Sequence, residues 1–392
     1  MAPFVYFDNA ATTALDPQVA EAMKPWLGSR FGNASSLYLP GRQARQAVEK
    51  ARQQVAELLN ADPTEIVFTG SGTEADNLAL IGAAEAFENG RNHIVTSSIE
   101  HPAVLETCRY LERRGIEITF LQPQPDGIIA PSALADALRP TTGVVSIMAA
   151  NNVTGVVQPI AELSRIAHEH SVLFHTDAVQ TVGKLPLDVR AHPIDLLSIS
   201  AHKLHGPQGV GALYVRNGVK LEPLVHGGGQ ERGLRSATEN VAGLVGLGRA
   251  AEIACAEMSA EAARLVQLRD RIVECITDKI PNAYLIGHRY RRLPGHLCLG
   301  FSGQEGEGIR LLLALDEAGF CVSSGSACSA HHATEPSYVL LAMGFDPFRA
   351  RGSLRITLSR FNTDTEVDRF LDVLPRAIEE LRPITSRTGA LP

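Results

Sequence analysis

One cysteine of this 392-residue sequence lies in a segment that has the composition of a loop. Cys328 follows the run SSGSA and precedes a tract of serine, alanine and histidine. Most free cysteines behave as small buried hydrophobic residues, so this setting is unusual for a thiol. A thiolate here could act as a nucleophile or as a metal ligand, and the third interpretation is an incidental position in a surface loop.

A second reactive group follows an apolar run with the composition of a strand. The run IDLLSIS (194–200) ends with Ser200 and is followed by His202 and Lys203, before the chain enters Gly-Pro. A lysine beside a histidine in such a loop is not typical of a solvated surface. In a site shielded from water the pKa of its amine would fall, and the amine could form a Schiff base.

Two more polar groups follow strand-like runs. The run VLFHTDA (172–178) ends with Asp177, and Gln180 comes shortly after it. His101 stands between the run HIVTSS and Pro102. Asp177 could cap the next helix or pair with a buried cation, and a lone histidine in such a position is more often structural than functional.

The segment TGSGTEADN (69–77) follows a strand-like run and opens a helical pattern. Its glycines would let backbone N–H groups approach an anion at the start of a helix. An ordinary turn capped by Thr73 is an equally favoured interpretation. The segment lacks the GK[ST] of a P-loop, so a nucleoside triphosphate is not the predicted ligand.

These groups share one chemical logic. A phosphate cradle, a carboxylate, a lysine and a histidine all follow strands of one predicted sheet, where ligands bind in open α/β folds. Pyridoxal phosphate requires phosphate donors, an acid for its pyridinium nitrogen and a lysine for its aldehyde. Asp177 paired with the ring nitrogen would keep the ring protonated and able to accept electrons.

The elements that must position these residues predict a two-part α/β architecture. A helical stretch at about 240–280 leads from a large domain (15–255) into a smaller α+β domain (1–14 and 256–392), which carries the cysteine loop (321–337). Alternation of strands with helices predicts a mostly parallel, seven-stranded sheet in the large domain. The predicted strands are 66–69, 93–98, 118–122, 143–150, 172–178, 194–200 and 211–215.

Composition excludes several classes of function. The chain has 36 basic and 43 acidic residues, a net charge of −7, which argues against general binding to nucleic acid or to anionic membranes. The six cysteines form no C-x-x-C pair, so neither a disulfide scaffold nor a zinc knuckle is predicted. No apolar run approaches the roughly 20 residues that span a bilayer. We therefore expect a soluble protein of the reducing cytoplasm.

The sequence resembles the NifS/IscS-type (class I) cysteine desulfurases, PLP-dependent fold-type I enzymes of the class V aminotransferase group. The resemblance covers nearly the whole chain and includes Lys203 and Cys328. It departs from the family pattern at NNVTG, at SAHK and in a loop after Cys328 that is about one residue longer. The motifs that carry it, in order, are FDNAATT, FGNASS, GTEADN, EHPAVL, NNVTG, HTDAVQTVGKLPLD, SAHKLHGPQGVG, HGGGQERGLRSATEN, SSGSAC and EPSYVL.

The resemblance implies roles for residues around pyridoxal 5'-phosphate. Lys203 would bond to the cofactor aldehyde, Asp177 would hold the pyridinium, and His101 would stack on the ring and shuttle protons. Gln180 would contact the phenolic oxygen. Thr238 would reach the phosphate of the partner subunit, which implies a homodimer. The remaining cofactor contacts would come from Gly72, Thr73, Asn152, Ser200 and His202.

The resemblance also implies the substrate and the reaction. L-cysteine would be bound through its carboxylate by Arg355 and Asn152, with Asn33 nearby; the guanidinium fork of an arginine matches a carboxylate. The Cys328 thiolate would take the sulfur as a persulfide, and L-alanine would leave. The sulfur would pass to an Fe–S scaffold protein or to a thiolated product.

Three questions stay open at this stage. A selenocysteine lyase or another fold-type I aminotransferase-like enzyme is the alternative activity, although an aminotransferase would not need Cys328. An inactive adaptor is disfavoured, because Lys203 and Cys328 are both present. Cys328 could also ligate an Fe–S cluster during transfer, and His331 and His332 could either tune its thiol or be a tolerated insertion.

Overall fold

The structure is a computed structural model that describes residues 4–325 and 335–381. Its internal contacts divide the chain into two units. The larger unit comprises Thr12–Asn152 and Val156–Ala262. The smaller unit comprises Met1–Ala11, Val153–Gly155 and Ala263–Pro392.

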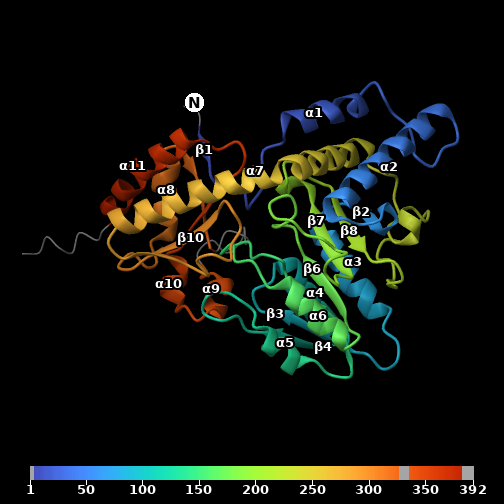
Figure 1. The fold of residues 1–392 in the computed structure, drawn as a ribbon, viewed down its shortest axis with the longest axis horizontal. Coiled ribbons are helices and arrows are strands. Elements are labelled where there is room, and N and C mark those ends of the chain that lie inside the picture. Colours follow the sequence, from blue (N-terminus) through green and yellow to red (C-terminus); the bar gives the residue numbers. More distant parts are fainter. Residues whose placement is uncertain (1–3, 326–334, 382–392) are drawn as a thin grey trace, which may run out of the picture. The chain divides into compact units, whose positions relative to one another are not determined.

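The larger unit is built on a seven-stranded sheet with the order β2-β8-β7-β6-β5-β3-β4 (Figure 1). Every neighbouring pair is parallel except the two that involve β8. The predicted mostly parallel seven-stranded sheet is thus confirmed, with one reversed strand. The strands are β2 (Ile66–Thr69), β3 (His93–Ser97), β4 (Glu117–Leu121), β5 (Thr142–Ser146), β6 (Leu173–Asp177), β7 (Leu196–Ser200) and β8 (Gly211–Val215).

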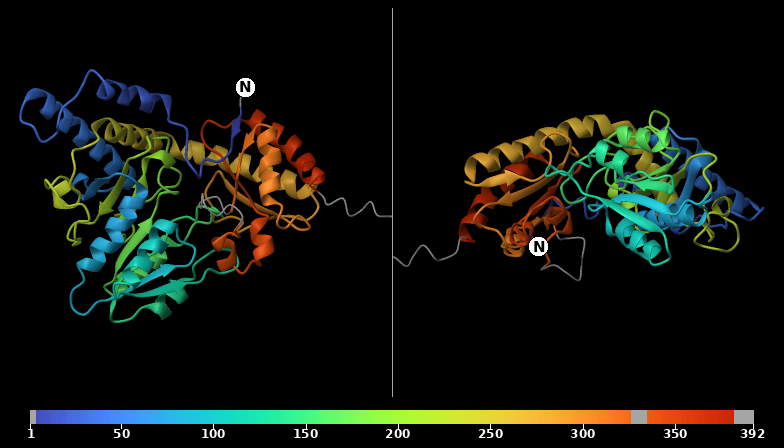
Figure 2. Two further views of the ribbon diagram at one scale, coloured as in Figure 1. Left: turned by 180° about the vertical axis from the view of Figure 1, so that it is seen from behind. Right: turned by 90° about the horizontal axis from the view of Figure 1, so that it is seen from below.

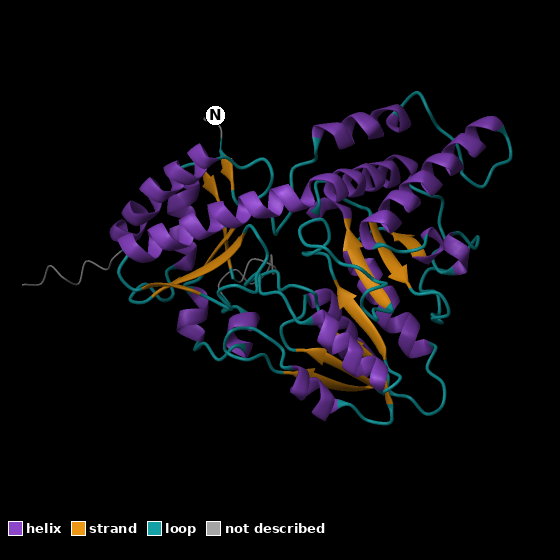
Figure 3. Ribbon diagram, in the orientation of Figure 1, coloured by secondary structure: helices purple, strands orange, loops and turns teal. Residues whose placement is uncertain are grey.

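The helices of this unit pack on the sheet and on one another (Figure 3). Helix α3 packs against α4 and against strands β5 to β8, and α2 contacts β2 (Figure 2). The core between α3, α4 and the sheet is made of aliphatic residues and small alanines, which allow close packing. The α-helices are α1 (Pro17–Met23), α2 (Leu39–Leu59), α3 (Gly72–Glu85), α4 (Pro102–Glu112), α5 (Pro131–Ala137) and α6 (Ile160–Glu169); the short 3-10 turns are η1 (Lys24–Leu27), η2 (Pro63–Glu65), η3 (Ala201–Lys203) and η4 (Glu231–Gly233).

The strand register places several strand ends at one edge of this sheet. Gly211, the first residue of β8, lies opposite both Thr69 at the end of β2 and Ser200 at the end of β7. Asp177, the last residue of β6, pairs with Ser198 of β7. The segments that follow β2, β6 and β7 therefore leave the sheet at the same edge.

The smaller unit has a separate sheet and core. Its four-stranded antiparallel sheet has the order β12-β13-β10-β9, and β1 pairs with β11 in parallel. The aromatic rings of Phe7, Phe320 and Phe370 meet at its centre. The strands are β1 (Val5–Tyr6), β9 (Ala283–Leu285), β10 (His296–Phe301), β11 (Phe320–Cys321), β12 (Ser323–Ser324) and β13 (Leu354–Thr357); the helices are α8 (Gly308–Glu317), α9 (Tyr338–Ala342), α10 (Pro347–Arg351) and α11 (Asp364–Glu380).

The long helix α7 (Val241–Lys279) contains the sequence boundary between the two units. It matches the helical stretch predicted at 240–280. Within the described residues, none of the helices is both long and apolar enough to cross a membrane.

Candidate active site

Asp177 is a buried carboxylate at the end of β6. Only 6% of the residue is exposed, and its Oδ1 accepts the N–H of Val179 at 2.9 Å. Burial raises the pKa of Asp177, and the nearby His101 and Lys203 oppose that shift. The three predicted residues Asp177, His101 and Lys203 therefore lie within electrostatic reach of one another.

Lys203 ends the short turn η3, which follows β7 at once. An N-terminal segment holds this turn in place. The N–H of Thr13 donates to the carbonyl of His202 at 2.9 Å, and Thr13 Oγ1 accepts the N–H of His205 at 2.8 Å. Thr12 Oγ1 lies 3.0 Å from Nδ1 of His202. Thr12 and Thr13, the last two residues of the FDNAATT motif, thus hold the backbone that carries Lys203, a role that the sequence did not reveal.

A second amine, Lys184, lies close to Lys203. Its Nζ donates to the carbonyl of Gln180 at 3.0 Å and is 3.5 Å from the side-chain oxygen of Gln180. Burial and the charge of Lys203 lower the pKa of Lys184 to about 7. Burial, with Lys203 and Lys184, also lowers the pKa of His202 to about 4. Near neutral pH His202 is therefore neutral and Lys184 only partly charged, and an anionic ligand beside them would favour their protonated forms.

His101 caps the N-terminus of α4. Its Nδ1 accepts the N–H of Ala103 at 3.1 Å, so the neutral ring carries its proton on Nε2. Burial lowers the pKa of His101, and the neutral form is favoured near neutral pH. His101 borders a cavity of about 520 Å³, which is also lined by Thr73, Asn77, Ile81, Pro102, Ala103, Glu106, Thr107 and Tyr110.

The segment TGSGTEADN forms a tight turn at the start of α3. Ser71 caps the helix by accepting the N–H of Glu74 at 3.1 Å. Thr73 instead lies in the first helical turn and is exposed, so the interpretation of Thr73 as the cap is wrong. Ser71 has extended backbone geometry, as a cap requires, and it lies one position before the first helical residue.

Gly72 brings this helix start against the two strand ends. A Cβ at Gly72 would lie 2.7 Å from Cγ2 of Val179 and 3.2 Å from Cβ of Ser200. Only glycine allows so close an approach. The first-turn N–H groups of α3 therefore lie beside Ser200, an arrangement suited to an anion.

Three buried titratable groups lie behind Asp177, and the sequence analysis did not single them out. Burial raises the pKa of Glu100 to about 8, and burial together with Asp177 raises the pKa of Asp76. Nε2 of His175 lies 3.6 Å from Asp76, and burial lowers the pKa of His175 to about 3. Their signal in the sequence was weak, since His175 stands in an apolar run, Asp76 near the start of α3 and Glu100 in the turn between β3 and α4.

Three other predicted residues of the larger unit lie in different settings. Asn152 is buried, with 4% exposed. Asn33 is exposed, and its Oδ1 accepts the N–H of Ser35 at 2.9 Å. Thr238 is also exposed. Asn33 and Thr238 are thus exposed, whereas Asp177 is buried.

Arg355 belongs to the smaller unit, where it stands in β13. It is 1% exposed and pairs with Asp8 at 2.7 Å. Arg355 is therefore not a surface residue of its strand, because its guanidinium is buried and ion-paired. Cys328, His331 and His332 lie outside the described residues.

Metal binding finds no support in the part of the chain that the structure describes. Residues 4–325 and 335–381 contain no cluster of three or more His, Cys, Asp or Glu side chains that could hold an ion. The predicted metal ligand, Cys328, lies outside these ranges.

Comparison with known proteins agrees with this fold and this set of residues. The family model described as aminotransferase class-V matches residues 5–370. A cysteine desulfurase IscS of Dictyoglomus turgidum is 49% identical over 381 residues, covering 97% of this chain and 96% of the relative. The chain belongs to the aminotransferase class-V family and, within it, to the NifS/IscS-type cysteine desulfurases.

Solved structures support the same placement. A NifS-like protein superposes with a TM-score of 0.90 at 40% identity, over 96% of this chain and all of that protein. A structure described as SspA in complex with cysteine superposes with a TM-score of 0.81 at 37% identity, over 91% of this chain and 99% of that one. The family predicted from the sequence motifs is thus confirmed.

Proposed function

We propose that this protein is a pyridoxal-phosphate-dependent cysteine desulfurase that converts L-cysteine to L-alanine and stores the sulfur as a persulfide on Cys328. The observation that carries the proposal is the gathering of Lys203, Asp177 and His101 beyond one sheet edge. The comparison with cysteine desulfurases at up to 49% identity supports the choice of reaction.

The residues present fit pyridoxal phosphate by their chemistry. The cradle at Gly72, with the N–H groups of α3 and Ser200 beside it, suits the phosphate dianion. The pKa of Asp177 is raised by burial, so a cation at the ring nitrogen would favour its ionised form. Lys203 would supply the amine for the aldehyde. His202 adjoins it in η3, and Gln180 accepts a hydrogen bond from Lys184, whose pKa is lowered by burial and by Lys203. When bound, the cofactor would supply an electron sink that weakens bonds around the substrate Cα.

The chain's own groups would handle the protons and the substrate. Lys203, released by the incoming amino group, would take the Cα proton at Nζ. His101 can take up a proton at Nδ1 only by giving up its bond from Ala103, so its protonation would be coupled to release of the α4 cap. Arg355 and Asn152 would hold the substrate carboxylate, with Asn33 nearby. Arg355 would then exchange part of its pairing with Asp8 for the substrate.

Sulfur transfer would be completed by Cys328. Its thiolate would attack the substrate sulfur, so that an S–S bond forms while the substrate Cβ–S bond breaks. The electron pair left on Cβ takes up a proton, and alanine leaves. Sulfur would then pass from Cys328 to an acceptor thiol of a scaffold protein or of a thiolation system.

The test follows both products from one reaction. The purified protein is expected to be yellow and to release alanine and, with a thiol reductant, sulfide from L-cysteine in equal amounts. Cys328→Ala should lose sulfide release, whereas Cys255→Ala, which removes an exposed cysteine, should behave as wild type. Full sulfide release by Cys328→Ala would overturn the persulfide step.

The Cys328→Ala variant also distinguishes a cysteine desulfurase from a selenocysteine lyase, the alternative activity. A selenocysteine lyase would retain turnover of L-selenocysteine in Cys328→Ala, because selenium leaves without a thiol nucleophile. A desulfurase is expected to prefer L-cysteine and to need Cys328 for it. A colourless protein that cannot bind pyridoxal phosphate would remove both enzymes.

We also propose a homodimer, in which Thr238 reaches the cofactor phosphate of the partner subunit. The exposure of Thr238 fits this assignment. The segment 27–39 also exposes several large apolar side chains, which a dimer interface could cover: Leu27, Phe31, Leu37, Tyr38 and Leu39. Sedimentation should give a dimer, and a monomer with full activity would contradict it.

A further inference from the structure

The loop that carries Thr238 has strained backbone geometry. This Thr238 loop comprises residues 226–240 and contains the turn η4. Glu231, Arg232 and Gly233 have φ values of 47°, 58° and 86°, so three consecutive residues are left-handed. Two of them are not glycine, and left-handed backbone geometry is unfavourable for residues with a Cβ. Neighbouring contacts must therefore hold this conformation.

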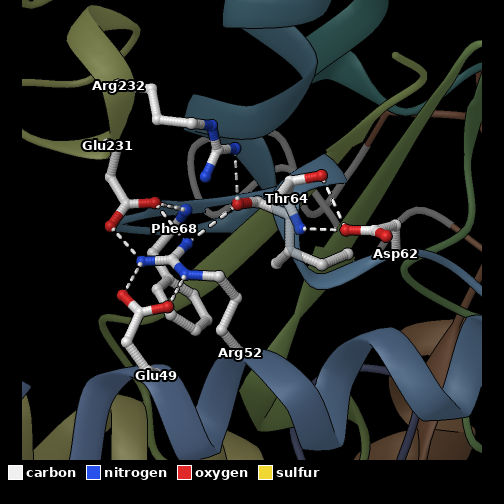
Figure 4. A network of polar contacts seen from close by, with 8 residues as sticks. Glu49, Arg52, Asp62, Thr64, Phe68, Glu231 and Arg232 are labelled. Carbon is white, nitrogen blue, oxygen red and sulfur yellow. Dashed lines mark hydrogen bonds and ion pairs between the residues drawn. The ribbon is translucent and has the colours of Figure 1, made fainter. Parts of the chain in front are cut away.

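A buried ion pair supplies those contacts (Figure 4). The guanidinium of Arg52, on α2, donates to both carboxylate oxygens of Glu231 at 2.7 and 2.8 Å. The two side chains are only 7% and 5% exposed. Glu231 also accepts the N–H of Phe68 at 2.8 Å, and Arg52 donates to the carbonyl of Ile66 at 2.8 Å. The loop is thereby bonded to both α2 and β2.

The surroundings of the ion pair favour an arginine at position 52. Arg52 lies 4.5 Å from the centre of the Phe68 ring, and Glu49 is a second acceptor at 3.2 Å. Arg232 donates to Ile66 as well, at 2.9 Å. A fork-shaped guanidinium satisfies all of these positions, whereas a lysine would satisfy few of them. Loss of either charge would leave the other buried without its main partner.

A weaker ion pair ties the same loop to the α3 turn. Arg235 contacts the two carboxylate oxygens of Glu74 at 2.7 and 3.3 Å, and Glu74 also accepts the N–H of Gly70 at 2.9 Å. Both side chains are 25% exposed. The more accessible pair is screened by water, so the buried pair is the main anchor.

We propose that Arg52 and Glu231 are positioning residues for the cofactor site of the partner subunit. Their ion pair holds the Thr238 loop in the left-handed conformation that offers Thr238 outward to the second subunit. The inference rests on the proposed homodimer and on the proposed role of Thr238. Neither Arg52 nor Glu231 is assigned a contact with cofactor or substrate.

Mixed dimers test the inference, because only one of their two sites can bond the cofactor. Subunits with different affinity tags are co-expressed and purified through both tags. In the first dimer one subunit carries Lys203→Ala and the other carries Glu231→Gln. In the second dimer one subunit carries both changes and the other is wild type. The readout is the rate at which holoenzyme releases pyridoxal phosphate after dilution, measured by fluorescence.

The two arrangements predict different results. In the first dimer the intact Lys203 site receives Thr238 from a subunit with normal Glu231, so release should match a dimer with Lys203→Ala alone. In the second dimer it receives Thr238 from the altered loop, and we expect release to be about tenfold faster, the equivalent of one lost contact. Equal rates in the two dimers, or faster release from the first, would overturn the inference.

The same two dimers made with Thr238→Ala in place of Glu231→Gln test the premise, the proposed role of Thr238, independently of the positioning role. If Thr238→Ala accelerates release only in the second arrangement and Glu231→Gln does not, the positioning role alone fails. If neither does, or if the protein is monomeric, the premise fails and the inference with it.

Two further variants are compared: Arg52→Lys tests the other member of the ion pair, and Glu117→Gln is the control for an unrelated loss of charge. Arg52→Lys keeps the charge but not the fork, and should release the cofactor faster than wild type in the same arrangement. It also replaces Glu231→Gln if that variant does not form dimers. Glu117→Gln removes the exposed pair with Arg139 and should leave release unchanged.

Discussion

Two regions of the larger unit are positioned by different kinds of force. Asp177 is the last residue of β6, and Lys203 ends the short turn after β7; backbone hydrogen bonds set the register of both strands. The Thr238 loop has no strand, and side-chain ion pairs through Glu231 and Arg235 hold it. A strand end tolerates changes of its side chain, because the backbone stays in place. A loop held by side chains does not.

The strand-end residues carry out chemistry, whereas the ion-paired residues of the Thr238 loop position other groups. Substitutions at the strand ends should remove a chemical step and leave the fold intact. Substitutions in the loop anchors should leave the chemistry available and loosen its geometry.

The largest effect is expected at a strand end. Lys203→Ala should reduce desulfuration by at least about 10³-fold, since proton transfer and cofactor attachment depend on its amine. The free energy of unfolding should stay within about 1 kcal/mol of wild type. Alanine production from L-cysteine and urea unfolding are the measurements. A variant that also unfolds easily would mean that the strand end depends on this side chain.

A smaller loss of turnover is expected at Asp177. Asp177→Asn keeps the shape and the bond from Val179 but removes the negative charge. We expect kcat to fall about 10²-fold, because charge stabilisation in a buried site is lost, while the cofactor remains attached through Lys203. Cofactor content and kcat are measured on the same sample. Equal losses of both would show that Asp177 acts by retaining the cofactor.

The buried anchor of the loop should affect stability more than a strand end does. Glu231→Gln is expected to lower the free energy of unfolding by about 3 kcal/mol, since it leaves Arg52 buried without its main counter-charge. Thermal and urea unfolding give the value. A change below that of Lys203→Ala would contradict the contrast between the two regions.

Glu100 offers a pH-dependent test behind the strand ends. Its pKa is about 8 in the folded protein, against an ordinary value of 4.5, so the folded state holds a proton that the unfolded state releases. Its contribution to stability is therefore present below pH 4.5 and is lost as pH rises towards 8. Glu100→Gln keeps an oxygen for the N–H of Met148 and the hydroxyl of Ser97. The variant should gain stability relative to wild type as pH rises from 5 to 8. A constant difference across that range would show that Glu100 does not titrate there.

The smallest effect is expected at the exposed anchor. Glu74→Gln should change the free energy of unfolding by less than about 1 kcal/mol, because its pair with Arg235 is accessible to water. High salt should reduce even that difference. An effect as large as that of Glu231→Gln would mean that burial does not rank the two anchors.

The sequence predicted the strand-end region far better than the loop. Apolar runs of four to eight residues mark buried strands, and the polar residue after each run locates the sheet edge, so Asp177 and Lys203 could be found. The cap at α3 was assigned to Thr73 instead of Ser71, because both residues are good caps and stand two positions apart.

The anchors of the loop could not have been predicted. Arg52 and Glu231 are 179 positions apart, and each looks like an ordinary charged surface residue in the sequence. The antiparallel direction of β8 and the burial of Lys184 likewise depend on long-range packing. Arg355 was proposed as a carboxylate ligand, but its ion pair with Asp8 appears only once the chain is folded.

The most direct test of the central claim is mass spectrometry of the protein after incubation with L-cysteine and without a reductant. We predict one additional sulfur atom on the peptide that contains Cys328, formed together with an equal amount of alanine, and no such addition in Lys203→Ala. Alanine formed by the wild type without sulfur on Cys328 would contradict the account.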